Sequence, residues 1–379
     1  MSVLFEHARK IDANGEVDDF WMLVDGDTIT HVGNGAAPTA DTTVDVGGRW
    51  LAPGFIDLHC HGGGGFAFDD GADSITNALA VHRAHGTTRS VISLVANPLA
   101  LLRDSLEVIA EMAAHDPLVL GAHLEGPFLE IEHRGAHNAD YLREPQPAAI
   151  DDLLQAAHGR LRQLTIAPDL PNALESIEIL VEAGVTVAVG HTNASFEQTR
   201  DAFAAGARLI THAFNAMPGI HHRAPGPVVA AFEDDRVVIE LILDGLHVHP
   251  DVAALAFASA PGRIALVTDA MAAAGASDGD YQLGSLAVTV ADGKAVLRGT
   301  STIAGSTLTL DAAVRLALGP VGLSPREAIA AVTLTPATAL GLEGRLGLLS
   351  PGYAADAVLL DHDWQVTEVW GAGKRIAVA

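Results

Sequence analysis

The chain has 379 residues, of which 49% are hydrophobic and 18% charged, and this composition is typical of a globular protein with a large core. Its formal net charge of −25 argues against nucleic acid and against an anionic membrane surface as partners, because both require clustered Lys and Arg. The single cysteine, Cys60, excludes an internal disulfide, and the sequence has neither a signal-peptide-like start nor an apolar run of about 20 residues, so we expect a soluble cytoplasmic protein.

Short strand patterns separated by Gly-containing turns occupy both ends of the chain. They are predicted at Phe20–Val24, Thr28–Val32, Ala357–Leu360 and Val366–Trp370. Neither end has enough apolar residues to fold alone. We therefore expect residues 1–52 and 347–379 to pair with each other as one small β-sandwich domain, with residues 53–346 inserted between them as a second domain.

The middle of the chain alternates short apolar runs with helical patterns, which indicates a parallel sheet. Eight strands are predicted, at Phe55–His59, Ser90–Val95, Leu118–Leu124, Leu164–Ala167, Val185–Val189, Leu209–Thr211, Val237–Leu241 and Ile264–Thr268. Helices are predicted between them at Ser74–His85, Leu99–His115, Leu174–Ala183 and Ser195–Ala205.

Two helix starts are marked by capping boxes, in which Ser195 is followed by Gln198 and Ser324 by Glu327. Pro325 would take the first position of the second helix. Eight strands with intervening helices predict a closed (β/α)8 TIM barrel. A doubly wound sheet is the alternative, but no GxGxxG motif follows the first strand.

Metal-competent side chains follow the ends of five of the eight predicted strands. They are His59 and His61 after the first strand, Glu125 after the third, His191 after the fifth, His212 after the sixth and Asp269 after the eighth. In a barrel, the C-terminal ends of all strands meet at one mouth. Because imidazoles and carboxylates are metal ligands, the pattern predicts a bound divalent cation, with zinc and iron(II) fitting about equally well.

Each of these residues alone has an ordinary structural role available. One His-x-His pair is a weak signal, Glu125 could form a salt bridge, and Asp269 or His191 could cap a helix. Their combined position at strand ends favours the metal site. We expect Cys60, between the two histidines of the first strand, to be a buried packing residue and not a ligand.

The predicted chemistry follows from the cation. A divalent ion lowers the pKa of bound water toward about 7, and a nearby carboxylate can take the proton of that water and return it to a leaving group. Asp269 is the candidate for this role because it follows the last strand, apart from the other ligands. The arrangement suits hydrolysis of an amide, an ester or a deaminable ring, and it does not suit hydride transfer.

Longer segments around these residues carry a family resemblance. They are Pro53-Gly54-Phe55-Ile56-Asp57, His123-Leu124-Glu125-Gly126-Pro127-Phe128, Gly135-Ala136-His137-Asn138, Gly190-His191-Thr192, Thr211-His212-Ala213-Phe214-Asn215-Ala216-Met217, Asp244-Gly245-Leu246-His247, Val267-Thr268-Asp269-Ala270 and Ala304-Gly305-Ser306. Together they resemble the amidohydrolase superfamily and, within it, the N-acetylglucosamine-6-phosphate deacetylases. The resemblance runs along nearly the whole chain.

The resemblance implies roles for the residues that carry it. Glu125, His191 and His212 correspond to the ligands of the metal that family members share. Asp269 corresponds to the general base that later protonates the departing amine. His137 corresponds to the residue that helps to polarise the acetyl carbonyl. Since His59 and His61 are both present, one or two ions per subunit are expected, with Glu125 bridging a pair.

The resemblance also implies a phosphate site and a homodimer. The backbone amides of Asn215 and Ala216, with Arg223 and His247, would bind the phosphate, and some of these contacts come from the neighbouring subunit in the family. Further substrate contacts are implied at Ala136, Ile303, Ala304 and Gly305. In an acidic chain, the segment His221-His222-Arg223 supplies the local positive charge that an anionic substrate needs.

The expected reaction is hydrolysis of N-acetyl-D-glucosamine 6-phosphate to D-glucosamine 6-phosphate and acetate, in amino-sugar catabolism. Two alternatives remain open. One is another amidase of the superfamily, such as a D-aminoacylase. The other is a non-catalytic barrel relative, which should have lost ligands that this chain retains.

Overall fold

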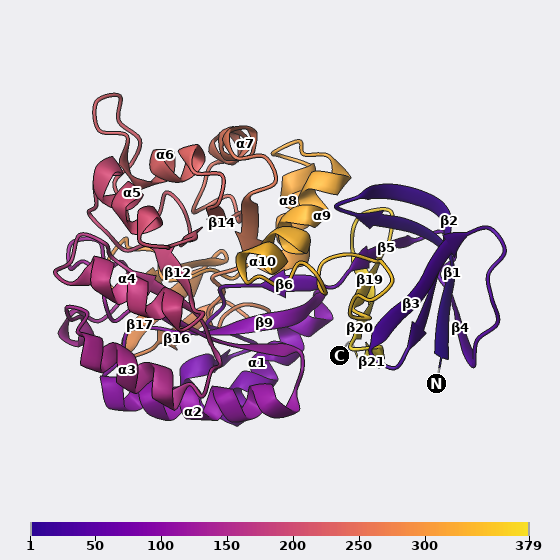
Figure 1. Cartoon of the computed structure of the whole chain (residues 1–379), viewed down its shortest axis with the longest axis horizontal. Coiled ribbons are helices and arrows are strands. Elements are labelled where there is room, and N and C mark those ends of the chain that lie inside the picture. The colour runs from indigo at the N-terminus through magenta and orange to yellow at the C-terminus, as the bar shows by residue number, and fades with distance from the viewer. Residues whose placement is uncertain (1, 378–379) are drawn as a thin grey trace.

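Eight parallel strands form the central sheet of the larger part of the molecule (Figure 1). The computed structural model describes residues 2–377. In chain order the strands are β6 (Phe55–Asp57), β9 (Thr87–Leu94), β10 (Val119–Glu125), β11 (Leu161–Ile166), β12 (Thr186–Val189), β13 (Leu209–Ile210), β14 (Val238–Ile242) and β15 (Ile264–Val267). Each overlaps one of the eight predicted strands, so the barrel prediction is confirmed.

The barrel closes just beyond the ends of its first and last strands. There the Asp269 backbone N–H donates to the His59 carbonyl, and the His61 N–H donates to the Ala270 carbonyl, both at 2.8 Å. Closure therefore occurs at residues that follow β6 and β15, and it brings the predicted ligands of the first and eighth strands together at the mouth.

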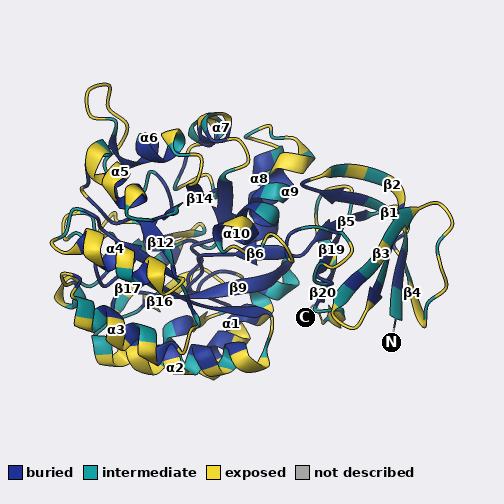
Figure 2. Cartoon of the chain, in the orientation of Figure 1, coloured by how far each residue is buried: buried dark blue, intermediate teal, exposed yellow. Residues whose placement is uncertain are grey.

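Helices surround the sheet and bury one face each against it. They are α1 (Ala72–Ala84), α2 (Leu99–His115), α3 (Pro147–Ala156), α4 (Ala173–Glu182), α5 (Phe196–Ala204), α6 (Gly226–Glu233), α7 (Pro250–Ser259), α8 (Leu310–Leu318), α9 (Pro325–Val332) and α10 (Leu334–Ala339). Figure 2 shows buried strands inside and exposed outer helix faces. Two short 3-10 helices lie at Phe68–Asp70 and Ala139–Tyr141.

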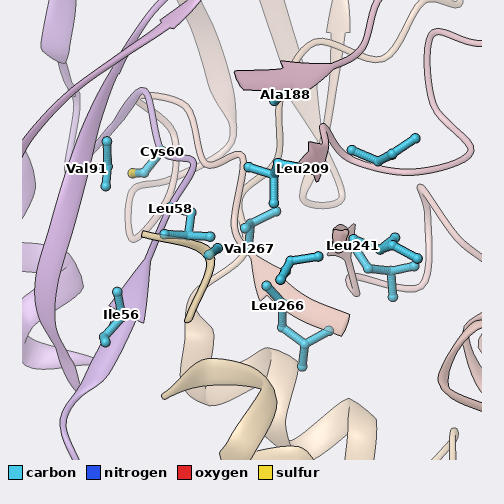
Figure 3. Packing of buried hydrophobic residues seen from close by; sticks show 14 of the residues in the cluster. Ile56, Leu58, Cys60, Val91, Ala188, Leu209, Leu241, Leu266 and Val267 are labelled. Atoms are coloured by element: carbon cyan, nitrogen blue, oxygen red, sulfur yellow. The ribbon is translucent and has the colours of Figure 1, made fainter. Parts of the chain in front are cut away.

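Local sequence signals explain where several helices begin. Both predicted capping boxes are present, with the hydroxyl of Ser195 accepting the N–H of Gln198 and that of Ser324 accepting the N–H of Glu327. Pro325 is the first residue of α9, as predicted. The core that these elements enclose contains packed side chains of the strands and of the inner helix faces, and Figure 3 shows Val91 and Leu266 of the strands with Leu58 just after β6.

The two ends of the chain form one sheet beside the barrel (Figure 1). Its strands are β1 (Ser2–Asp12), β2 (Gly15–Asp25), β3 (Thr28–Asn34), β4 (Thr42–Asp45), β5 (Trp50–Pro53), β19 (Ala357–Leu360), β20 (Val366–Gly371) and β21 (Lys374–Ile376), in the order β21-β20-β19-β5-β1-β2-β3 with β4 on β1. The predicted pairing of the ends is confirmed by the antiparallel ladder between β5 and β19.

This sheet is continuous and curls around its own core. The rings of Phe5 on β1 and Trp370 on β20 lie with centroids 4.9 Å apart, although β5 and β19 separate these strands in the sheet. The two layers expected of a sandwich are therefore parts of one curled sheet. The domain boundaries at residues 52/53 and 346/347 stay a prediction.

An antiparallel sheet that the sequence patterns did not predict follows β15. It consists of β16 (Gly279–Leu283), β17 (Leu286–Ala291) and β18 (Lys294–Leu297), and a two-stranded hairpin of β7 (Gly62–Gly63) and β8 (Phe66–Ala67) lies after β6. Within residues 2–377, no helix combines the length and the apolar character that a membrane crossing requires.

Candidate metal centre and substrate cavity

A cavity of about 270 Å³ opens at the C-terminal ends of the barrel strands. Its walls include twelve of the predicted site residues: His61, Glu125, Ala136, His137, His191, His212, Asn215, Ala216, His247, Asp269, Ile303 and Gly305. Two predicted residues lie below the surface of the cavity, since His59 and Ala304 are both 0% exposed. Arg223 is exposed and does not line the cavity of its own chain.

The first group of ligand atoms joins the ends of β6, β10 and β15. The Nε2 atom of His61 lies 3.1 Å from Glu125 Oε2 and 3.4 Å from Asp269 Oδ1. His59 Nε2 lies 3.3 Å from Glu125 Oε1 and 3.5 Å from Asp269 Oδ1. One ligand atom from each of these four residues lies within 4.8 Å of all the others, so the set can share one cation.

The second group shares Glu125 with the first. His191 Nε2 and His212 Nε2 lie 3.1 and 3.0 Å from Glu125 Oε1, and 2.9 Å from each other. These residues follow β12 and β13, which are neighbours in the barrel. The two groups thus share Glu125, and its carboxylate could contribute a ligand atom to a cation in either group.

The hydrogen bonds of the rings show that the donor set fits a cation. His191 Nδ1 lies 2.9 Å from the His133 carbonyl oxygen, which can only accept, so Nδ1 carries the proton and the Nε2 of the neutral ring carries a lone pair. His59 Nδ1 faces Glu240 Oε2 at 3.1 Å in the same way. In the neutral rings both Nε2 lone pairs would point at Glu125 Oε1, an arrangement that a cation makes favourable. Without a cation, burial disfavours a charge on His59, but the charges of Glu125 and Asp269 raise the pKa of His59 well above its ordinary value, so a bound cation would replace the Nε2 proton.

Burial and the clustered charges shift the acidities of this centre in opposite directions. Burial disfavours the charged form of His61, but hydrogen bonds to Asp269 and Glu125 outweigh it and raise the pKa of His61 to about 10. For His191 burial dominates and lowers its pKa to about 4. Burial also disfavours a charge on Glu125, but the His59 and His137 rings hold its pKa well below the ordinary value.

Asp269 is ionised at neutral pH despite its burial. Burial alone would raise its pKa, but the charge of His59 and a hydrogen bond from His61 lower the pKa of Asp269 to about 2. A carboxylate in this state can accept a proton from a nearby acid.

His137 presents a proton to the same centre. Its Nδ1 accepts the backbone N–H of Ala96 at 3.1 Å, so the neutral ring carries its proton on Nε2. That atom lies 3.3 Å from Glu125 Oε2 and lines the cavity. His137 is therefore a hydrogen-bond donor at the cavity floor.

Several residues at or below the centre were missed by sequence reasoning. Glu240 is fully buried on β14 and bonds to His59, and His123 is fully buried on β10 between the Ser93 and Thr165 hydroxyls. Both could have been found from the sequence, because each is a charged or polar residue inside a strand that was predicted to be buried. Leu283, the last residue of β16, and Thr302, in the segment after β18, also line the cavity.

Cys60 is buried, as expected of a packing residue. Its Sγ lies 3.3 Å from His82 Nε2, and burial raises the pKa of the thiol to about 12. Cys60, His82 and Asp57 form a third group of potential metal ligands. None of the three lines the cavity.

Comparison with known proteins agrees with this geometry. The model of the family described as "Amidohydrolase family" matches residues 50–376. An N-acetylgalactosamine-6-phosphate deacetylase from Escherichia coli O157:H7 is 37% identical, with 99% of each chain covered. The human N-acetylglucosamine-6-phosphate deacetylase is 38% identical over 89% of this chain and 86% of its own.

Solved structures share the whole architecture. The N-acetyl-D-glucosamine-6-phosphate deacetylase of Mycobacterium smegmatis, solved as an aspartate-to-alanine variant in complex with N-acetyl-D-glucosamine 6-phosphate, is 41% identical with a TM-score of 0.93, and 100% of this chain and 99% of that chain are covered. A deacetylase from Pasteurella multocida is 29% identical, with a TM-score of 0.95 and 100% of both chains covered. The chain therefore belongs to the amidohydrolase family, and its resemblance to the sugar-phosphate deacetylases of that family is confirmed.

Proposed function

We propose that this protein is a metal-dependent deacetylase that hydrolyses N-acetyl-D-glucosamine 6-phosphate to D-glucosamine 6-phosphate and acetate. One observation carries the proposal: two pairs of histidine rings meet at Glu125 in a cavity. The ionised Asp269 and the proton donor His137 lie beside them. Relatives that are similar along the whole chain and are named as deacetylases of N-acetylated sugar phosphates support the choice of substrate.

The residues of the cavity divide the reaction between them. A divalent cation held by Glu125, His191 and His212, with His59 and His61 offering a second position, would supply an acidified water and polarise the amide. Asp269 accepts the proton of the attacking water and returns it to the amine nitrogen as the C–N bond breaks. His137 donates its Nε2–H to the acetyl oxygen, where negative charge develops.

The sugar phosphate would extend from this centre along the cavity wall. Asn215 and Ala216 line the wall that follows β13, and His247 lines it after β14. The Nδ1 of His247 lies 2.7 Å from Asp244 Oδ2, which fixes the orientation of the ring. Ala136, Ile303 and Gly305 lie on the remaining wall and would contact the sugar. Ala304 is buried behind it and would act through its neighbours.

The exposed position of Arg223 supports a homodimer. Its side chain lies outside the cavity of its own chain, on a loop that also exposes Ile220. An arginine in such a loop can reach the cavity of a neighbouring subunit and bind phosphate oxygens there. We propose this arrangement, and light scattering of the purified protein tests it, since a monomer would contradict it.

The metal is proposed to be zinc or iron(II), with one or two ions per subunit, because the donors are imidazole and carboxylate. The proposed location is the cytoplasm, which fits a chain whose only cysteine is a buried free thiol. Metal analysis of the protein as purified tests the first statement, and a preparation that holds neither metal and binds neither would contradict it.

N-acetyl-D-galactosamine 6-phosphate is a second candidate substrate, because the Escherichia coli relative is named as a deacetylase of that sugar phosphate. The two sugars share the acetamido group and the 6-phosphate and differ in the configuration at C4. Acetate release should be measured with both sugar phosphates, with unphosphorylated N-acetyl-D-glucosamine and with an N-acetyl-D-amino acid. We expect the glucosamine phosphate to give the highest kcat/KM. Preference for the amino acid would indicate a D-aminoacylase.

A further inference from the structure

Glu240 is a carboxyl group sealed inside the barrel directly below the candidate metal centre. It lies on β14 between Ile239 and Leu241, and all three side chains are 0% exposed. Burying a carboxylate in an apolar core costs several kcal/mol unless its oxygens are hydrogen-bonded. The hydrogen-bond partners of Glu240 therefore indicate which residues this carboxylate supports.

Both oxygens of Glu240 accept hydrogen bonds. Oε1 lies 2.7 Å from the amide Nε2 of Gln163 on β11. Oε2 lies 3.2 Å from the backbone N–H of His212 and 3.1 Å from His59 Nδ1. A backbone N–H can only donate, so Oε2 is an acceptor, and His59 must place its proton on Nδ1.

We propose that Glu240 is a positioning residue that fixes His59 as a metal ligand and links it to His212, and so controls how tightly the His59–His61–Glu125–Asp269 group holds its cation. The proposal rests on the metal centre of the proposed function. When a cation replaces the proton on Nε2, the bond to Glu240 keeps the remaining proton of His59 on Nδ1, and Nε2, 3.3 Å from Glu125 Oε1, faces the ligand group. A carboxylate on the far nitrogen of a ligating ring also makes that ring a better donor.

The other rings of the centre lack this support. His191 Nδ1 bonds to the backbone carbonyl of His133. Among the described residues, His61 Nδ1 and His212 Nδ1 have no hydrogen-bond partner. Glu240 thus hydrogen-bonds the far nitrogen of one candidate ligand ring, that of His59. The same oxygen, Oε2, also accepts the backbone N–H of His212, which belongs to the second ligand group.

Two substitutions separate its charge from its geometry. Glu240→Gln keeps the shape and an acceptor oxygen for His59 and His212, and Gln163 can turn its amide to accept the new NH2, because its own Oε1 has no partner among the described residues. Glu240→Leu removes the hydrogen bonds altogether. His59→Ala identifies the ion that depends on His59, and Asp12→Asn, at a fully buried carboxylate of the small sheet, is the matched control.

The experiment measures metal binding directly. Each full-length variant is stripped with a chelator, checked for folding by circular dichroism, and titrated with Co²⁺ and Zn²⁺ to give the stoichiometry, the dissociation constants and the cobalt absorption spectrum. We expect Glu240→Leu to weaken the His59-dependent ion by about 10- to 100-fold and Glu240→Gln to weaken it less. The double variant Glu240→Leu/His59→Ala should bind no more weakly than His59→Ala alone.

Several outcomes would overturn the proposal. They are a folded Glu240→Leu variant with wild-type dissociation constants, additive losses in the double variant, or a His59→Ala variant that binds metal normally. If Glu240→Leu does not fold, Glu240→Gln decides, and unchanged constants and cobalt spectrum there reject the idea. Acetate release by the wild type is measured in parallel. Its absence would refute the proposed function, whereas its presence with metal binding unaffected by Glu240 would refute only this inference.

Discussion

Three residues of the centre adopt left-handed backbone conformations just after their strands end. The φ angles are 46° at His191, 27° at His212 and 46° at Asp269. Such angles are unfavourable for residues with a Cβ and persist only where the surroundings enforce them. Here each turn directs a side chain from the strand end into the mouth. The centre therefore has a conformational cost, which is typical of a functional site.

The proton carrier gives the first prediction. Asp269→Asn keeps the size and one oxygen of the side chain but removes the basic carboxylate. We expect kcat to fall by about 10²- to 10⁴-fold while substrate binding and the cation held by Glu125, His191 and His212 stay close to wild type. Steady-state kinetics and metal analysis check this, with the exposed Asp251→Asn as control. Near-normal kcat would assign the proton transfer to another residue.

Arg223 gives the second prediction. Arg223→Ala should raise KM for N-acetyl-D-glucosamine 6-phosphate far more than KM for the unphosphorylated sugar, because the guanidinium is proposed to bind the phosphate. Arg103→Ala, on the exposed face of α2, should change neither value. Equal effects of Arg223→Ala on both sugars would remove the phosphate role.

At this scale the sequence could predict which side chains gather at the barrel mouth but not the residues that support them. His191 and Asp269 were predictable because a polar residue at a strand end faces the barrel mouth. Glu240 lies within a buried strand, where sequence reasoning expects packing, and its bonds to His59 and Gln163 depend on which strands are neighbours. The position of Arg223 outside the cavity of its own chain could not be predicted, because it depends on the conformation of a loop.

At the scale of elements, a buried ionic network ties α8 to α1. The carboxylate of Asp311, at the start of α8, accepts from His85 at the end of α1, from Thr309 and from Arg315. Burial alone would raise its pKa, but these hydrogen bonds hold the pKa of Asp311 below its ordinary value. The folded state therefore binds a proton at Asp311 more weakly than the unfolded state does.

This network gives the third prediction. Because the folded pKa is depressed, its stabilisation is fully present above the unfolded pKa of about 3.9 and is lost as the pH falls through the folded value. Asp311→Asn should lower the free energy of unfolding by about 1.5–3 kcal/mol at pH 7. The gap to wild type should shrink below about pH 4. Urea unfolding from pH 7 to 3 measures it, with exposed Asp104→Asn as control, and a pH-independent gap would contradict the assignment.

The elements that were predicted are those whose signals are local. The bounds of α2 match the predicted helix Leu99–His115, since apolar residues recur along one face and a strand follows. The sheet of β16, β17 and β18 was missed although Asp292-Gly293, between alternating apolar residues, is a typical hairpin turn. The strand predictions rested on the alternating strand-helix pattern of the barrel. The antiparallel sheet is inserted after the last barrel strand and does not share that pattern.

At the scale of the whole molecule, the centre exists only when the barrel is closed. Its candidate ligands include His59 near the start of the barrel and Asp269 after the last strand, and the backbones of these two residues are themselves hydrogen-bonded at 2.8 Å. A cation that binds this arrangement binds the folded chain and not the unfolded one. Metal binding and barrel stability are therefore linked.

Removal of the metal gives the fourth prediction. Treatment with a chelator should abolish acetate release and lower Tm, because a ligand present at 100 times its Kd stabilises the folded state by about 2.7 kcal/mol. Activity and Tm should both return when zinc or iron(II) is restored. A protein that loses all its metal and keeps both its Tm and its activity would refute the metal centre.

Metal binding should also release protons, which is the fifth prediction. Hydrogen bonds to Asp269 and Glu125 raise the pKa of His61 to about 10, so without a cation the ring is protonated at neutral pH, and a cation that binds its nitrogen must displace that proton. The apparent affinity should therefore fall as the pH falls. Titration calorimetry of the stripped protein in buffers of different ionisation enthalpy counts the protons. His61→Ala should release fewer and the exposed His249→Ala the same number as wild type, whereas heats independent of the buffer would show that His61 does not bind the ion.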